Sequence, residues 1–181
     1  MTTSSASATP RAPLPVRIRA PRPDELTAVG ELTADAYLTG GALADASEDG
    51  YLTHLRDAAA RAEEAELLVA VDGTDRVVGT VTVCRAGTGW AEVAEDGEVE
   101  MRMLAVAPGL WGRGIADALV SDVIRRASDE GARRLVLLVL HGNPAPVRLY
   151  ERHGFRAVPE RDWSPYDGLL LCAYTLDLGD A

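Results

Sequence analysis

The stretch from Glu98 to Ala116 constrains this chain more than any other part of the sequence. Residues 98–106 alternate between apolar and polar side chains, as a half-buried strand does. The triplet APG at 107–109 ends that strand, and the letters WGRGIA at 111–116 open an amphipathic helix predicted over Gly112–Glu130. Strand, break and glycine-rich helix start together predict a loop built to hold a ligand.

The chemistry of that helix start favours an anion. The first N–H groups of a helix have no partner inside it, and the helix dipole places about half a positive charge there. Gly112 and Gly114 carry no side chain that would keep a phosphate away from the backbone. Arg113 adds a full positive charge. We therefore predict a phosphate site on Gly112, Arg113, Gly114, Ile115 and Ala116.

The amino-acid sequence of this segment excludes two common phosphate-binding motifs. A Walker loop needs Gly-Lys-Ser/Thr, and the chain contains no lysine because all 18 of its Lys and Arg residues are Arg. A dinucleotide fingerprint starting at Gly112 and Gly114 requires Gly or Ala at position 117, where Asp117 stands. The acid would also repel a pyrophosphate.

Composition and charge narrow the class of protein. The chain has 181 residues and a net charge of −10. We expect residues 1–15, which are rich in Ser, Thr, Ala and Pro, to form a disordered arm, and residues 16–181 to form a single domain. The acidic balance argues against a nucleic-acid partner and favours a cationic acceptor such as an amine.

Targeting and metal signals are weak in this sequence. We find neither the pattern of a signal peptide nor an apolar run of the roughly 20 residues that a membrane span needs, so we expect a cytoplasmic protein that does not bind membranes. Cys84 and Cys172 lie far apart, and the three histidines are scattered. We therefore expect reduced thiols and no metal site.

The periodicity of the whole chain predicts an α/β (α+β) mixed sheet. Helices are expected over Glu25–Tyr37, residues 47–65, Gly112–Glu130 and Pro146–His153. Strands are expected over Val16–Arg19, Leu67–Val71, Val77–Val83, Glu98–Val106, Arg134–Leu140 and Gly168–Leu178. The order β-α-α-β-β-β-α-β-α-β contains one parallel β-α-β crossover, at residues 98–140.

Two motifs carry a resemblance to a known family. MLAVAP at 103–108 followed by GRGIA at 112–116 resembles the acyl-CoA-binding motif of the GNAT superfamily, a strand, a Pro-containing turn and Q/R-x-x-G-x-G/A. Asn143, Ala145 and LYERHGF at 149–155 resemble its second signature. Trp111 departs from the pattern, because the family has Gln or Arg there. That departure puts a side-chain contact in doubt and leaves the backbone ligands intact.

The resemblance implies a fold, a cofactor and site residues. The fold is the GNAT-like acyl-CoA N-acyltransferase fold, a mostly antiparallel sheet with a parallel pair at strands 4 and 5, flanked by helices. The co-substrate is acetyl-CoA. Leu104, Ala105 and Val106 match the family strand that pairs with the pantetheine arm of the co-substrate. Asn143 matches a side chain that contacts the same arm, and Tyr150 matches a residue proposed as the general acid.

Amide formation also needs a base that frees the amine nucleophile. Glu100 is the first candidate, because the family often places a glutamate at the matching position; alternatively, it belongs to the polar face of a half-exposed strand. His141 is the second candidate, since it follows a buried strand and histidine changes charge near neutral pH; alternatively, it is a loop residue without a role. Water is the third. Tyr150 could instead be a core tyrosine packed beside Phe155.

Two classes of function remain open. The first is an N-acetyltransferase that transfers an acetyl group from acetyl-CoA to a primary amine of a small molecule or a protein by direct attack. The second is a non-catalytic acyl-CoA-binding or sensing module of the same fold. An O-acyltransferase and a longer acyl donor are not excluded. The chain is also compatible with a homodimer, and residues 16–97 spell no particular acceptor.

Overall fold

The computed structural model describes residues 11–41, 48–165 and 167–179, and its elements follow the predicted order. The helices are the 3-10 turn η1 (Pro23–Glu25), α1 (Leu26–Thr39), α2 (Glu48–Arg56), α3 (Ala58–Glu64), α4 (Ile115–Asp129), α5 (Pro144–Arg152) and the 3-10 turn η2 (Pro159–Arg161). The strands are β1 (Arg17–Arg19), β2 (Glu66–Val71), β3 (Val77–Arg85), β4 (Glu98–Val106), β5 (Arg134–Leu140), β6 (Arg156–Ala157) and β7 (Leu171–Asp177).

The strands form one seven-stranded sheet in the order β1-β2-β3-β4-β5-β7-β6. The pair β4–β5 is parallel and the other pairs are antiparallel. This confirms the predicted mixed sheet with its parallel pair at strands 4 and 5. The short strand β6 was not predicted; its two residues pair with Thr175 and Tyr174 of β7.

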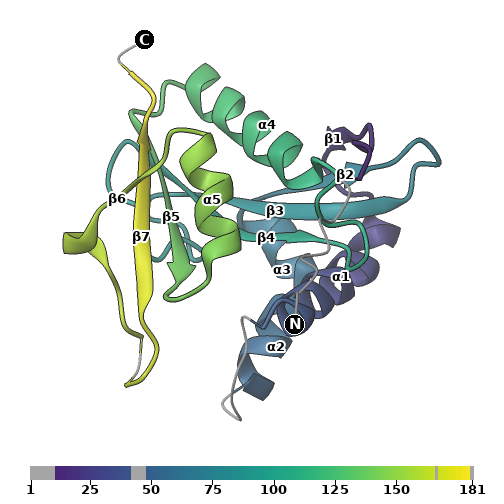
Figure 1. Ribbon diagram of the computed structural model, residues 1–181, viewed down its shortest axis with the longest axis horizontal. Helices are drawn as coiled ribbons and strands as arrows, with labels where there is room; N and C mark the ends of the chain where they lie inside the picture. The colour runs from purple at the N-terminus through teal and green to yellow at the C-terminus, as the bar shows by residue number, and fades with distance from the viewer. Residues whose placement is uncertain (1–10, 42–47, 166, 180–181) are drawn as a thin grey trace, which may run out of the picture.

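Helices cover both faces of the sheet. The largest core cluster joins α4 and α5 to β2–β5. Its side chains include Ile115 and Leu119 of α4, Leu135 and Leu137 of β5, and Tyr150 of α5. Two smaller clusters pack α1, α2 and α3 against the opposite face. Figure 1 shows α4 and α5 on the near side, while β5 and β7 run crosswise to β3 and β4. The sheet is therefore strongly twisted between these two pairs of strands.

Two predicted helix boundaries need correction. The helix expected over residues 47–65 is two helices, because Asp57 leaves the helical conformation with φ −77° and ψ 65° and its side chain caps α3 by accepting from the N–H of Ala60. The helix expected from Gly112 begins at Ile115, because Gly112 and Gly114 both take positive φ.

The N-terminal segment lies partly within the described residues. The expected disordered arm covers residues 1–15, of which 1–10 lie outside the described part. Residues 11–14 differ from that expectation, because they hydrogen-bond to the segment before α4: the N–H of Leu14 donates to Arg113 O at 3.0 Å. Within the described ranges, every helix is too short or too polar to cross a membrane.

Candidate functional site

The sheet splits between β4 and β5. The two strands pair only through residues 98–100 and 134–136, although β4 continues to Val106 and β5 to Leu140. Beyond Glu100, the β4 edge that faces β5 has no strand partner among the described residues. Its N–H and C=O groups can therefore bond to an extended ligand, as an edge strand bonds to an added strand.

A buried carboxylate holds the closed end of the split. Glu98 is 2% exposed, and its oxygens accept from Arg161 at 2.9 Å and from Arg134 at 3.3 Å. Arg134 is the first residue of β5, and Arg161 belongs to η2. The start of β4 is thereby tied to two neighbouring elements by charge-assisted hydrogen bonds.

A β-bulge turns β4 where the split opens. In the register with β3, Thr82 lies opposite Arg102 but Thr80 opposite Ala105, so β4 carries one extra residue there. Met103 has φ +50°, which is rare for a side chain of that size. Met103 packs against the α1–α2 side, and Leu104 packs against the α4–α5 side. The bulge breaks the alternation of the strand and redirects its backbone at the split.

The loop after β4 presents unpaired N–H groups. Gly112 and Gly114 have φ +74° and +79°, and Gly114 precedes the first residue of α4. The N–H groups of residues 112–117 donate no hydrogen bond to any described residue. The indole of Trp111 donates to Val106 O at 2.8 Å, so the residue that departs from the family pattern fastens the loop to the end of β4.

Asn143 and Tyr150 come from the segment after β5. Asn143 precedes α5, and its side-chain amide makes no hydrogen bond within the described residues. Tyr150 is 7% exposed, and its ring meets Phe155 edge-on with centroids 5.7 Å apart. Burial raises the pKa of Tyr150 above its usual value of 10.0. The phenol therefore stays protonated at neutral pH.

An aromatic group packs on the α1–α2 face of the sheet, in the cluster that contains Met103 of β4. Burial raises the pKa of Tyr37 well above its usual value, and the neighbouring hydroxyls of Tyr51 and Tyr150 raise it further. The rings of Tyr37 and Tyr51 lie 6.4 Å apart between centroids. His54 stacks on Trp90 at 4.3 Å, and burial lowers the pKa of His54, so its imidazole is neutral at pH 7.

The carboxylate of Glu100 is buried and hydrogen-bonded within the fold. It is 1% exposed, and Oε2 accepts from the N–H groups of Glu92, Val93 and Ala94 at 2.7, 2.9 and 3.2 Å. Oε1 lies 3.7 Å from Nε of Arg102. These contacts order the loop before β4 and leave a substrate amine little access to the carboxylate.

His141 lies at the open end of β5 and is exposed. Its N–H donates to Leu170 O, and its Nδ1 lies 3.5 Å from Sγ of Cys172. Both cysteines are free thiols, as expected, and burial raises the pKa of the Cys84 thiol to about 12.

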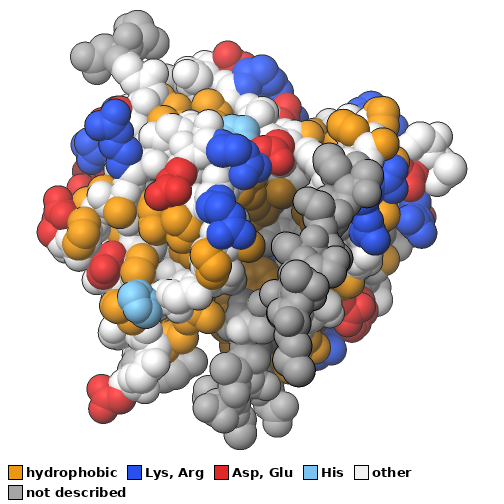
Figure 2. Space-filling view, in the orientation of Figure 1, with side chains coloured by type: hydrophobic (Ala, Val, Ile, Leu, Met, Phe, Trp, Pro, Cys, Tyr) orange, Lys and Arg blue, Asp and Glu red, His pale blue; other side chains and the backbone are white. Residues whose placement is uncertain are grey.

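Arginines surround the side of the split near α5. Figure 2 shows a hollow with hydrophobic side chains on its floor and arginine side chains over α5. Arg148 of α5 has no carboxylate partner in the described part of the chain, whereas Arg152 pairs with Asp117 of α4 at 2.9 Å. In a chain with a net charge of −10, this rim suits an anionic ligand.

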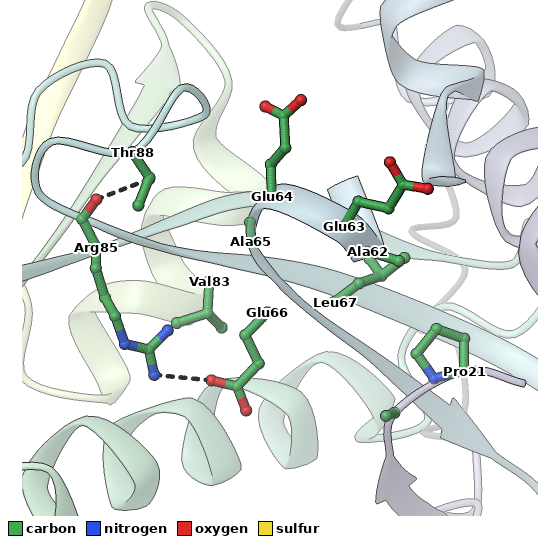
Figure 3. A pocket seen from close by; sticks show the side chains of 11 residues that line it. Pro21, Ala62, Glu63, Glu64, Ala65, Glu66, Leu67, Val83, Arg85 and Thr88 are labelled. Carbon is green, nitrogen blue, oxygen red and sulfur yellow. Dashed lines mark hydrogen bonds and ion pairs between the residues drawn. The ribbon is translucent and has the colours of Figure 1, made fainter. Parts of the chain in front are cut away.

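A separate groove of about 570 Å³ lies at the other end of β3 (Figure 3). It is lined by the start of β2, the end of β3 and the end of α3. Arg85 donates to Glu66 at 3.0 Å across it, while Glu63 and Glu64 point away from this pair. The phosphate loop is attached at the opposite end of β3, where Ala107 N–H donates to Val78 O, so the groove is not part of the split.

The same strand, loop and helix define a known family. The acetyltransferase (GNAT) family model matches residues 28–155, which include β4, the phosphate loop, β5 and α5. This chain belongs to the GNAT family. The family segment therefore contains all the site residues predicted above.

Relatives and solved GNAT structures agree with this membership. The chain is 35% identical over 81 residues to an uncharacterised N-acetyltransferase of Mycobacterium tuberculosis, covering 45% of this chain and 47% of the relative. It is 33% identical over 115 residues to a mycothiol acetyltransferase of Propionibacterium freudenreichii, covering 60% and 37%. This GNAT chain thus spans about half the length of the first of these relatives, and less of the second.

The fold is shared with experimentally solved GNAT proteins. An acetyltransferase of Staphylococcus aureus superposes with a TM-score of 0.68 at 14% identity, covering 91% of this chain and 100% of that one. A phosphinothricin acetyltransferase of Sinorhizobium meliloti, solved in complex with acetyl-CoA, gives 0.66 at 19% identity, covering 91% and 89%. At these identities the likeness concerns the GNAT fold alone.

Sequence reasoning missed two features of the GNAT site. The bulge at Met103 has no glycine to signal it. The hydrogen bonds that bury Glu100 were not predicted. The charged residues Glu98, Glu100 and Arg102, which share one face of the strand, were the only sequence pattern that could have indicated buried charge there.

Proposed function

We propose that this protein is an N-acetyltransferase that moves an acetyl group from acetyl-CoA to a primary amine by direct attack. The observation that carries the proposal is the split. The unpaired edge of β4 and the unpaired N–H groups before α4 follow one another along the chain, so one ligand with an extended arm and a pyrophosphate can bond to both.

The residues at the split fit the parts of this co-substrate. Backbone groups of Leu104, Ala105 and Val106 would bond to the amides of the pantetheine arm, with Asn143 contributing its free side-chain amide. The N–H groups of residues 112–116 would hold the pyrophosphate, and Arg113 would add charge. When bound, acetyl-CoA supplies a thioester carbonyl that an amine can attack.

Tyr150 supports the proposal as the acid. The amine nitrogen forms a bond to the carbonyl carbon, the C–S bond breaks, and the sulfur takes a proton. The hydroxyl of Tyr150 has no hydrogen-bond partner in the described parts of the chain, so it is free to donate to the sulfur.

The proton of the amine needs an acceptor, and we propose His141 for that role. The carboxylate of Glu100 is nearly inaccessible and accepts three backbone hydrogen bonds, so we assign Glu100 to ordering residues 92–94. His141 is exposed at the open end of β5, where an acceptor amine can reach its ring directly or through one water. The net charge of −10 supports a cationic amine as the acceptor.

A thiol-release assay tests the function. Purified protein with acetyl-CoA is offered a panel of small primary amines, amino sugars and peptides with free amino groups, and free CoA is measured over time. Acceptor-dependent CoA release is expected for at least one class of amine. Tight acetyl-CoA binding without acceptor-stimulated release across the panel would favour the non-catalytic acyl-CoA-binding module instead.

A further inference from the structure

The N-terminal segment Arg11–Leu14 lies against the phosphate loop. The N–H of Leu14 donates to Arg113 O at 3.0 Å, Nε of Arg113 donates to Ala12 O at 3.1 Å, and Nη1 of Arg11 donates to Gly109 O at 2.7 Å. Leu14 also packs against the core cluster that contains Ile115. Three hydrogen bonds thus join this segment to residues about a hundred positions away.

The Leu14 contact fixes the orientation of one peptide in the loop. In a planar trans peptide, the C=O of Arg113 and the N–H of Gly114 point in opposite directions. Because the Leu14 N–H holds that C=O, the Gly114 N–H is held facing away from the segment. A carbonyl oxygen would repel a phosphate, so this bond keeps the loop in the orientation that an anion needs.

The Arg11 contact places a second cation beside the loop. Arg11 and Arg113 line one small groove with Ala12 and Gly109. In the described ranges, neither arginine has a carboxylate within salt-bridge distance, whereas most other arginines of this acidic chain are paired. Each guanidinium has five N–H donors, of which the contacts above use one, so both keep donors for an anion.

We propose that the segment Arg11–Leu14 is part of the cofactor site: Arg11 and Arg113 together bind a phosphate group of coenzyme A, and Leu14 positions the loop. The inference rests on the proposed function for its ligand. Coenzyme A carries a pyrophosphate and a phosphate on its ribose, more charge than one helix N-terminus neutralises. A guanidinium pair is suited to bind such groups through charge-assisted hydrogen bonds.

Calorimetric titration with CoA and with dephospho-CoA, which lacks the ribose phosphate, tests the role of Arg11. Arg11→Ala is expected to weaken CoA binding about tenfold, the usual effect of losing one charge-assisted hydrogen bond. Arg17→Ala is the matched control, because Arg17 is exposed on the nearby strand β1 and pairs with Asp75. A loss confined to CoA assigns Arg11 to the ribose phosphate, and an equal loss with both ligands assigns it to the pyrophosphate.

A second pair of variants tests the role of Leu14. Leu14→Pro removes the N–H donor, and Leu14→Ala keeps it while removing the apolar contact. Weaker binding of both ligands is expected for Leu14→Pro relative to Leu14→Ala, with thermal melting measured alongside to show that both variants fold.

The outcomes separate this inference from the proposed function. Equal CoA affinity in Arg11→Ala and Arg17→Ala would overturn the assignment of Arg11, and equal affinity in the two Leu14 variants would overturn the positioning role. A failure of the unaltered protein to bind CoA would overturn the proposed function, and the inference with it.

Discussion

At the scale of single residues, buried polar groups divide into those that hold the fold and those left free for chemistry. Glu98 and Glu100 have their oxygens occupied by arginines or backbone N–H groups. Buried Tyr150 and half-buried Asn143 have no hydrogen-bond partner for their side chains in the described parts of the chain. Such free groups keep their hydrogen-bonding capacity for a ligand.

The hydroxyl of Tyr150 is predicted to matter for turnover and not for binding. Tyr150→Phe should lower turnover about a hundredfold or more, the usual contribution of a general acid, because the leaving sulfur loses its proton donor. Acetyl-CoA affinity should be nearly unchanged. The measurement is CoA release with the best amine of the panel, beside a calorimetric titration; an unchanged rate would remove Tyr150 as the acid.

Glu100 is predicted to act through the loop before β4. Glu100→Gln removes the charge that three N–H groups share and should lower the free energy of unfolding by about 1–3 kcal/mol. Glu95→Gln is the control, since the Glu95 side chain is 64% exposed in the same loop. Normal stability together with an altered pH–rate profile in Glu100→Gln would instead return Glu100 to the role of base, in place of His141.

Glu25 makes the free energy of unfolding depend on pH. The pKa of Glu25 is lowered to about 2, chiefly by two hydrogen bonds of 2.7 Å from Arg19. A lowered pKa stabilises the fold above the unfolded value near 4.5, and this stabilisation is lost as the pH falls from 4.5 toward 2. At pH 7, Glu25→Gln should unfold more easily by about 1–2 kcal/mol.

Denaturant titrations at several pH values check this expectation. The difference between Glu25→Gln and the unaltered protein should shrink as the pH falls below 4.5. A difference that stays constant down to pH 3 would contradict the assignment.

At the scale of elements, the functional geometry comes from where strands stop pairing. The sequence predicted β4, β5 and the helix after the glycines, because periodicity and glycine spacing report on local structure. The sequence did not predict the split between β4 and β5. The split depends on the bulge at Met103 and on the buried charge of Glu98, both set by contacts between distant segments. Asp57 ended a helix for a similar reason, since a capping bond outweighed a run of good helix formers.

The crossing of α1 and α2 is predicted to tolerate no side chain at Gly30. A Cβ there would lie 2.1 Å from Arg56 O, a backbone atom that cannot move alone. Gly30→Ala should therefore push the helices apart and cost about 1–3 kcal/mol or more. Gly50→Ala is the control, because nothing lies within 4 Å of its Cβ position on α2, and it should be neutral or stabilising.

Thermal melting of the two variants decides the matter. Equal melting temperatures for Gly30→Ala and Gly50→Ala would show that the helices do not pack as closely as described.

At the scale of the whole molecule, charge is distributed unevenly. The chain carries a net charge of −10. Around the phosphate loop and α5, however, Arg11, Arg113 and Arg148 have no carboxylate partner within the described ranges. An anionic cofactor and a cationic acceptor would be drawn to different regions of one surface. The sequence predicted the cofactor side in detail, because its ligands are contiguous backbone. It could not predict the acceptor, because residues 16–97 spell no particular one.

Acetyl-CoA binding across the phosphate loop is the central claim, and a matched pair of glycine variants tests it most directly. Gly114 and Gly87 both have positive φ and open space at the Cβ position, so Gly114→Glu and Gly87→Glu introduce the same charge and the same backbone strain. Calorimetric titration should show that Gly114→Glu loses acetyl-CoA affinity at least about a hundredfold, because a carboxylate would stand where the pyrophosphate binds. Gly87→Glu should bind acetyl-CoA as the unaltered protein does. Equal affinity in the two variants would contradict the account.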